Sequence, residues 1–216
     1  MVKDTKLTYD PPLSSGPNAL FQGDVYDFES DTPFVVRSQD ADHPFMLFSY
    51  MSGSSTIAEQ GAPPGYGDPE FVRVVPGAQY MSRYVFFTDP TFPETNLVVV
   101  RRKAKAGFAD VNLDCAGTLT GWVPIGSSTD YELTRIDLSR HNFEPQGKCD
   151  NGRHEMTSSG QFGVTIWGWG GPETRADAGT PCDQFQPDNS CDVSYAYPAG
   201  ENLIPINTVV VPTTPK

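Results

Sequence analysis

The sequence contains no apolar run near the eighteen or so residues that a membrane-spanning helix needs. Its start, MVKDTKLTYDPP, lacks the positively charged and then apolar regions of an export signal, so we expect either an intracellular chain or one whose signal was removed. Charged residues are only 19% of the chain, and 15 basic residues face 27 acidic ones. The net charge of −12 would repel a phosphate backbone or an anionic lipid surface, so neither nucleic acid nor membrane insertion is expected.

Catalytic motifs are also lacking. The sequence has no G-x-S-x-G elbow and no phosphate-binding glycine loop, and HEMTS at His154 lacks the second histidine of a zinc protease. The other histidines, His43 and His141, are scattered and have no evident nucleophile beside them. Asp68 and Glu70 could form a glycosidase carboxylate pair, but their spacing more simply indicates a turn and a strand edge. No enzyme activity is therefore predicted, and a carbohydrate-active hydrolase using loop carboxylates remains the alternative.

The composition that is present favours short strands and tight turns. The chain has 20 glycines, 20 prolines and 12% aromatic residues, and its apolar segments of five to eight residues show no sustained helical period. These features predict an all-β fold of ten to twelve strands with very little helix, an antiparallel β-sandwich of jelly-roll type. A weak sequence similarity between HPFMLFSYMSGS and GQFGVTIWGWGG would fit a domain built from two duplicated halves. We expect a polar arm at 1–20, one domain at 21–212 and a linker at 213–216.

One predicted strand has an irregular pattern. In YELTRIDL the apolar positions change phase between Leu133 and Ile136. Such a change predicts a β-bulge if the segment stays in one sheet, or otherwise a switch between sheets.

The four cysteines indicate disulfides. Cys182 and Cys191 enclose a loop rich in turn-forming residues, CDQFQPDNSC, which suits a disulfide-closed hairpin. Cys115 and Cys149 would then pair by default, although four cysteines allow three connectivities. A zinc site is the rival interpretation, but the sequence has no C-x-x-C spacing and only two histidines near Cys149. Disulfides favour a secreted or surface-exposed protein.

The stretch FGVTIWGWGG is the strongest candidate for a binding surface. Strand alternation places Phe162, Val164 and Ile166 on a core face and Trp167 and Trp169 on the other face. The two tryptophans then either pack beneath the acidic segment that follows, or form a platform on which a sugar ring or peptide side chain stacks.

Two tyrosines are expected to belong to the same platform. Tyr195 and Tyr197 lie in SYAYP, shortly after the acidic segment that would cover the tryptophans. In the binding interpretation their hydroxyls and that segment supply hydrogen bonds to the ligand.

Two acidic loops offer oxygen ligands for calcium. Asp188, Asn189 and Asp192 lie in PDNSCD, and Asp40 and His43 delimit DADH. Neither loop has the spacing of a complete calcium-binding loop, and solvated turn residues are the simpler interpretation. No cofactor is therefore expected, with calcium kept as an alternative.

The longer segments resemble a known family. GDPEFVRVVPGAQYMSRYVFFTDPTFPETNLVVVRR, GWVPIGSSTDYELTRIDLSRHNF, FGVTIWGWG and SYAYPAGENLIP resemble the N-terminal domain of IgGFc-binding proteins and its bacterial surface relatives, from about Phe34 to Pro212. The bacterial relatives share LDCAG and CDNGRHE, so the resemblance implies a Cys115–Cys149 disulfide. It also implies an extracellular β-rich module of adhesive or mucin-like proteins, with no catalytic residues or binding motif to carry over.

These observations predict a non-catalytic recognition or adhesion module that is secreted or exposed at a cell surface. Its expected partner is a glycan or a surface protein, and no oligomeric state is predicted. A hydrolase and a purely structural spacer are the alternatives. A spacer would have neither a concave pocket nor an exposed aromatic cluster.

Overall fold

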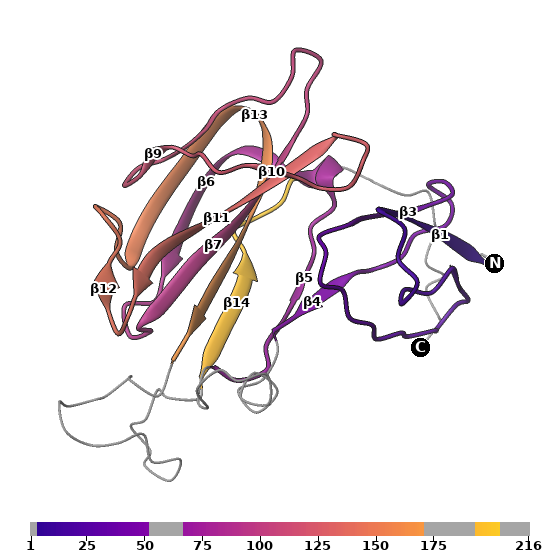
Figure 1. The fold of residues 1–216 in the computed structure, drawn as a ribbon, viewed down its shortest axis with the longest axis horizontal. Coiled ribbons are helices and arrows are strands. Elements are labelled where there is room, and N and C mark those ends of the chain that lie inside the picture. Colours follow the sequence, from indigo (N-terminus) through magenta and orange to yellow (C-terminus); the bar gives the residue numbers. More distant parts are fainter. Residues whose placement is uncertain (1–3, 52–66, 171–192, 204–216) are drawn as a thin grey trace, which may run out of the picture.

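The computed structural model describes residues 4–51, 67–170 and 193–203, which form antiparallel strands and one short 3₁₀ helix, η1 (Gly77–Gln79) (Figure 1). This arrangement confirms the predicted all-β fold. No helix in these residues is long and apolar enough to cross a membrane. The strands are β1 (Thr5–Asp10), β2 (Ala19–Leu20), β3 (Val35–Ser38), β4 (Phe48–Tyr50), β5 (Phe71–Arg73), β6 (Met81–Thr88), β7 (Glu94–Arg102), β8 (Val111–Leu113), β9 (Gly117–Thr118), β10 (Val123–Pro124), β11 (Tyr131–Arg140), β12 (Glu144–Pro145), β13 (Gly152–Trp169) and β14 (Ser194–Pro198).

A curled sheet of nine strands dominates the molecule, and its 18-residue strand β13 runs through both of its halves. The first half of β13 pairs with β6 and β8, and the second half pairs with β7 and β14. The pairing with β6 shifts register between Thr157 and Phe162, where one half gives way to the other. The two layers of the fold are therefore halves of one sheet, joined through β13 (Figure 1).

The core lies on the inner side of this sheet. Phe162, Val164 and Ile166 are 0%, 3% and 0% exposed, which confirms the predicted core face of β13. Their neighbours in the core come from both halves of the sheet, so burial of one apolar cluster holds the halves together. The buried members of this cluster are Tyr84, Phe86, Leu97, Val99, Val111, Leu113, Leu119, Leu138, Cys149, Met156, Phe162, Val164 and Ile166.

Two glycines allow aromatic rings to lie directly against the β13 backbone. A Cβ atom at Gly163 would lie 2.4 Å from the ring of Tyr80, and one at Gly168 would lie 2.1 Å from the ring of Tyr195. No side chain fits at such distances, so these positions require glycine. The glycines that interrupt the apolar pattern of FGVTIWGWG are thus explained by packing on both faces of the strand.

A disulfide joins Cys115, beside the β8–β9 turn, to Cys149, in the loop before β13. This confirms the pairing that the family resemblance implied. The sulfurs close a loop of 34 residues and fasten β13 to the turn after β8. Cys182 and Cys191, together with the calcium candidates Asp188, Asn189 and Asp192, lie outside the described residues.

A small N-terminal sheet, ordered β2-β1-β3, is attached to the curled sheet by polar contacts. The carboxylate of Asp10 accepts hydrogen bonds of 2.8 Å from the backbone N–H groups of Ser127 and Ser128 and from the Ser127 hydroxyl. Arg37 adds an ion pair of 3.2 Å with Asp130. The segment predicted as a polar arm thus contains β1, and the division of the chain into one domain with two tails stays a prediction.

Candidate functional site

A cavity of about 760 Å³ lies on the outer face of the curled sheet, opposite the core. One wall is formed by β7, β11 and the second half of β13, and the other by β4, β5 and the residues beside them. Trp167 and Trp169 line it, so we call it the tryptophan cavity. Both side chains are partly buried, on the face that alternation predicted. Figure 1 shows β4 and β5 lying between the curled sheet and the N-terminal sheet.

Strand register places polar side chains beside the tryptophans. Trp167 lies directly opposite Asn96 of β7, and Trp169 lies opposite Glu94. Directly opposed residues of an antiparallel pair have Cβ atoms about 5 Å apart, so each tryptophan borders a polar side chain. On the far side of β7, Asn96 lies opposite Asp137 of β11.

A β-bulge in β11 completes this polar group. The register between β11 and β7 shifts between Asp137 and Ser139. The shift turns Ser139 inward, where it is fully buried, and turns Arg140 outward into the tryptophan cavity. Arg140 then contacts the Glu94 carboxylate at 3.3 Å and the Asp137 carboxylate at 3.0 Å. The pairing of β11 with β7 is regular between Leu133 and Ile136, where the phase change predicted a bulge, so the prediction was wrong about its position. The bulge that is present has a direct effect on the site.

Glu94 is the most buried charged residue of this group, with 8% of its surface exposed. Burial raises the pKa of its carboxyl group, while the Asn142 backbone N–H and the Arg140 guanidinium act in the opposite direction. Glu94 and Arg140 are thus held as an ion pair at one end of the tryptophan cavity.

Asn96 and Arg135 line the tryptophan cavity, and the described residues leave polar groups of both without a partner. The Oδ1 atom of Asn96 is buried and accepts no hydrogen bond from these residues. Arg135 of β11 forms no ion pair among the described residues. It lies directly opposite Val98 of β7, two residues along that strand from Asn96. A buried acceptor and an unpaired guanidinium would both gain from a ligand that supplies their partners.

Tyr195 and Tyr197 do not belong to this site. They pair with Gly168 and Ile166, so their side chains lie on the core face of the sheet. The Tyr195 hydroxyl accepts the Asp89 backbone N–H at 3.1 Å, and the Tyr197 hydroxyl donates to the Phe87 carbonyl. Burial raises the pKa of both phenols. The structure thus separates the predicted partners, because β14 pairs with β13 in a register that places its tyrosines opposite core positions.

Their bonding gives the tyrosines a structural role. Phe87 is in β6 and Asp89 follows it, whereas the tyrosines are in β14. The ring of Phe92 also packs edge-on against Tyr195, with ring centroids 4.6 Å apart. The two phenols therefore connect the half of the sheet that holds β6 to the half that holds β14.

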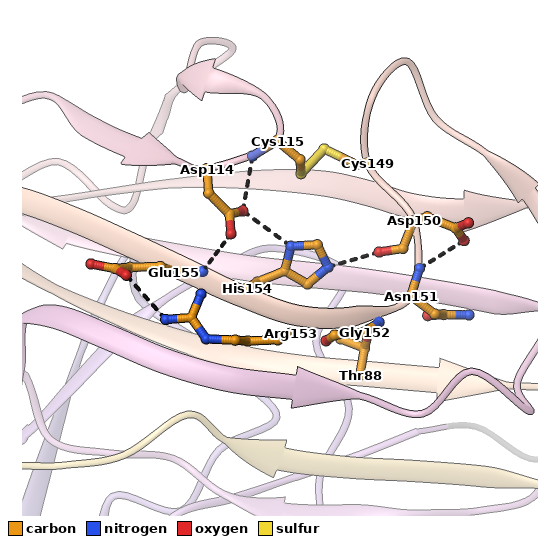
Figure 2. A network of polar contacts seen from close by, with 10 residues as sticks. All are labelled: Thr88, Asp114, Cys115, Cys149, Asp150, Asn151, Gly152, Arg153, His154 and Glu155. Atoms are coloured by element: carbon orange, nitrogen blue, oxygen red, sulfur yellow. Dashed lines mark hydrogen bonds and ion pairs between the residues drawn. A yellow bond between two sulfur atoms is a disulfide. The ribbon is translucent and has the colours of Figure 1, made fainter.

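A second polar cluster surrounds His154, which is 5% exposed (Figure 2). Its Nδ1 lies 3.1 Å from the Asp114 carboxylate, and its Nε2 lies 2.7 Å from the Asp150 carbonyl oxygen. Asp114 also accepts the backbone N–H groups of Cys115 and Glu155 at 2.8 and 2.9 Å. Both ring nitrogens therefore face hydrogen-bond acceptors.

The His154 cluster is not arranged as a metal or catalytic site. Asp114, Cys115 and His154 place ligand-type atoms within 4.8 Å of one another, but the Cys115 sulfur is bonded to Cys149. Each ring nitrogen of His154 already has an acceptor. The cluster instead joins the turn after β8 to the start of β13 beside the disulfide. LDCAG supplies Asp114 and Cys115 to this contact, and CDNGRHE supplies Cys149, Asp150 and His154, so the two motifs form its two sides.

The remaining predicted residues are engaged locally. Asp40 contacts His43 Nδ1 at 2.5 Å and accepts the Asp42 backbone N–H at 2.9 Å, and the histidine hydrogen bond lowers the pKa of its carboxyl group. The Glu70 carboxylate accepts the Phe71 backbone N–H at 3.0 Å, and Asp68 interacts through its backbone with Ser194.

Sequence reasoning missed four residues of the candidate site, namely Glu94, Asn96, Arg135 and Arg140. The available signal was the alternation in ETNLVVVRR, where Glu94 and Asn96 alternate with buried residues. Alternation shows that two side chains share a face, but not which strand lies beside them. The register between β7 and β13 was needed to bring them to the tryptophans.

Comparison with known proteins gives one match. The model of the family described as IgGFc binding protein matches residues 1–168. No curated protein and no solved structure matches the chain. The matched range includes β7, β11 and Trp167, and it ends one residue before Trp169.

Proposed function

Because the chain belongs to the IgGFc-binding protein family, which indicates an extracellular binding module, we propose that it is a non-catalytic recognition module of a cell surface. Its ligand binds in the tryptophan cavity. The observation that carries this proposal is the presence of two aromatic side chains beside polar groups that have no partner among the residues that the structure describes. A purely structural spacer would need no such cavity.

A glycan is the ligand class that best fits the lining. Sugar recognition needs an apolar surface for the ring and planar polar side chains for the hydroxyl groups. Trp167 and Trp169 supply the apolar surface. The polar groups are the amide of Asn96 and the carboxylate of Glu94 on the adjacent strand β7, and the guanidinium of Arg140 on β11.

A protein segment is the second candidate, favoured by a different part of the lining. Val98 and Val100 of the sheet line the cavity together with Val72, Val74 and Val75 of the other wall, so part of the lining is apolar. The family likewise suggests a protein partner. An apolar side chain of an extended peptide would be buried there.

Hydrolysis is less well supported than binding. A glycosidase needs a protonated carboxyl group and a separate carboxylate on either side of the scissile bond. Glu94 and Asp137 instead share the single guanidinium of Arg140. In this arrangement both carboxylates hold the cavity wall through Arg140.

A glycan and peptide binding screen of the purified protein tests the proposal. Trp167→Ala combined with Trp169→Ala should abolish binding, because both stacking surfaces are removed. Tyr26→Ala is the matched control, since Tyr26 is 58% exposed and lies outside the lining of the tryptophan cavity. Binding that survives the double substitution, with the far-ultraviolet spectrum unchanged, would show that this cavity is not the site.

A further inference from the structure

We propose that the glycan bound in the tryptophan cavity is acidic, with a carboxylate that pairs with Arg135, as a sialic or uronic acid would provide. This inference rests on the proposed function and names the ligand class more narrowly. It begins from the unequal pairing of the arginines that line the cavity.

Of the described residues, three arginines line the tryptophan cavity, and two of them pair with carboxylates. Arg73 pairs with Glu201 at 2.5 Å, and Arg140 pairs with Glu94 and Asp137. Arg135 has no ion pair within the described part of the chain, although acidic residues outnumber basic ones by 27 to 15. None of the carboxylates in the described part of the chain pairs with this guanidinium, so the described structure leaves it available to an anionic ligand.

The neighbours of Arg135 define what else the ligand must contain. Arg135 lies directly opposite Val98, and Asn96 is two residues from Val98 on the same face of β7. Diagonal neighbours of this kind are about 7 Å apart, and Trp167 lies about 5 Å beyond Asn96. One sugar residue with its substituents can contact all three side chains.

The three side chains have complementary requirements. Arg135 needs an anionic acceptor, the Oδ1 atom of Asn96 needs a donor, and Trp167 offers an apolar ring surface. An acidic sugar supplies a carboxylate, hydroxyl donors and a C–H face in one ring. A neutral sugar would leave the guanidinium without a charged partner.

The described charges in and beside the cavity balance one another. Glu94, which lines the cavity, and Asp137 and Glu201, which pair with its arginines, carry three negative charges, and Arg73, Arg140 and Arg135 carry three positive charges. The pairs formed by Arg73 and Arg140 leave Arg135 as the exposed unpaired charge. The pairing therefore directs a ligand carboxylate toward Arg135 and away from Glu94.

Calorimetric titration with matched probes tests this inference. Sialyllactose is compared with lactose, and glucuronic acid with glucose, at low ionic strength. The acidic probe of at least one pair should bind about 10-fold more tightly than its neutral counterpart, and Arg135→Ala should remove that difference while leaving the neutral probe unaffected. Arg135→Lys should keep part of the preference. Arg102→Ala is the control, because Arg102 is exposed on β7 and does not line the cavity.

The possible results separate this inference from the proposed function. If neutral probes bind in a tryptophan-dependent way and acidic probes bind no better, the proposed function stands and the carboxylate inference is wrong. The same holds if an acidic preference survives Arg135→Ala. If an acidic peptide binds through Arg135 and no sugar binds, the ligand class is wrong. If neither sugars nor peptides bind, both proposals fail.

Discussion

Trp167 and Tyr195 belong to directly paired strands, yet their side chains lie on opposite faces of the sheet. Trp167 lines the tryptophan cavity, and Tyr195 packs against the core and bonds to the backbone of Asp89. Substitutions at the two positions should therefore affect different properties.

The first prediction concerns Tyr195. Replacing it with phenylalanine removes the hydroxyl that accepts the Asp89 N–H, so the free energy of unfolding should fall by about 1 kcal/mol. Ligand binding should not change, because the side chain points away from the tryptophan cavity. Urea denaturation followed by circular dichroism measures the first effect, and titration with the best probe measures the second. A loss of affinity at unchanged stability would place Tyr195 at the binding site after all.

The second prediction concerns Gly168. Gly168→Ala would place a methyl group against the Tyr195 ring, and overpacking of this kind costs about 1–3 kcal/mol. The same substitution combined with Tyr195→Ala should be less destabilising than the sum of the two single changes, because the smaller side chain leaves room for the methyl group. Thermal or urea unfolding of the three variants gives the coupling. Strict additivity would mean that the close approach is not what requires glycine.

The third prediction concerns the disulfide. Serine at both Cys115 and Cys149 should lower the free energy of unfolding by roughly 3–4 kcal/mol, because the unfolded chain regains the freedom of a closed loop of 34 residues. Substitution is preferable to chemical reduction, since it changes this bond alone. Urea denaturation of the double variant is the measurement. A decrease below 1 kcal/mol would show that the His154 cluster holds the turn without the covalent bond.

The fourth prediction concerns pH. Hydrogen bonds from Ser127 and Ser128 lower the pKa of the Asp10 carboxyl group to about 2. A lowered folded-state pKa means that this stabilisation is fully present above the ordinary value near 4 and is lost as the pH falls from 4 toward 2. Asp10→Asn should therefore reduce the change in urea midpoint across this window.

The control for the pH experiment is Asp31→Asn, at an exposed carboxylate of the N-terminal region. It should leave the profile of the unmodified protein unchanged. If Asp10→Asn and Asp31→Asn gave the same profile, the Asp10 contact would not be the source of the pH dependence.

The parts of the structure that follow from local pattern could be predicted from the sequence. Alternation in FGVTIWGWG separated three core residues from two tryptophans, and each lies on the expected face. The phase change in YELTRIDL predicted a bulge between Leu133 and Ile136, but the pairing with β7 is regular there, and the bulge lies between Asp137 and Ser139. The phase change itself has another cause, because both faces of β11 are covered: Leu138 is in the core and Tyr131 lies against Gly77.

The composition of the site could not be predicted in the same way. Which residues border Trp167 and Trp169 depends on how β13 pairs with β7 and β14, and pairing register is a long-range property. Tyr195 is near the tryptophans in space yet lies on the other face, whereas Asn96 is distant in sequence and lies directly opposite Trp167. Single-strand periodicity contains no information that distinguishes these cases.

The path of β13 through both layers has a consequence for how the protein opens. Neither layer can separate from the other while this strand keeps its partners on both sides. Amide protons in its two halves should therefore exchange with solvent through one concerted opening and at similarly slow rates. The two layers should then unfold together as one cooperative unit.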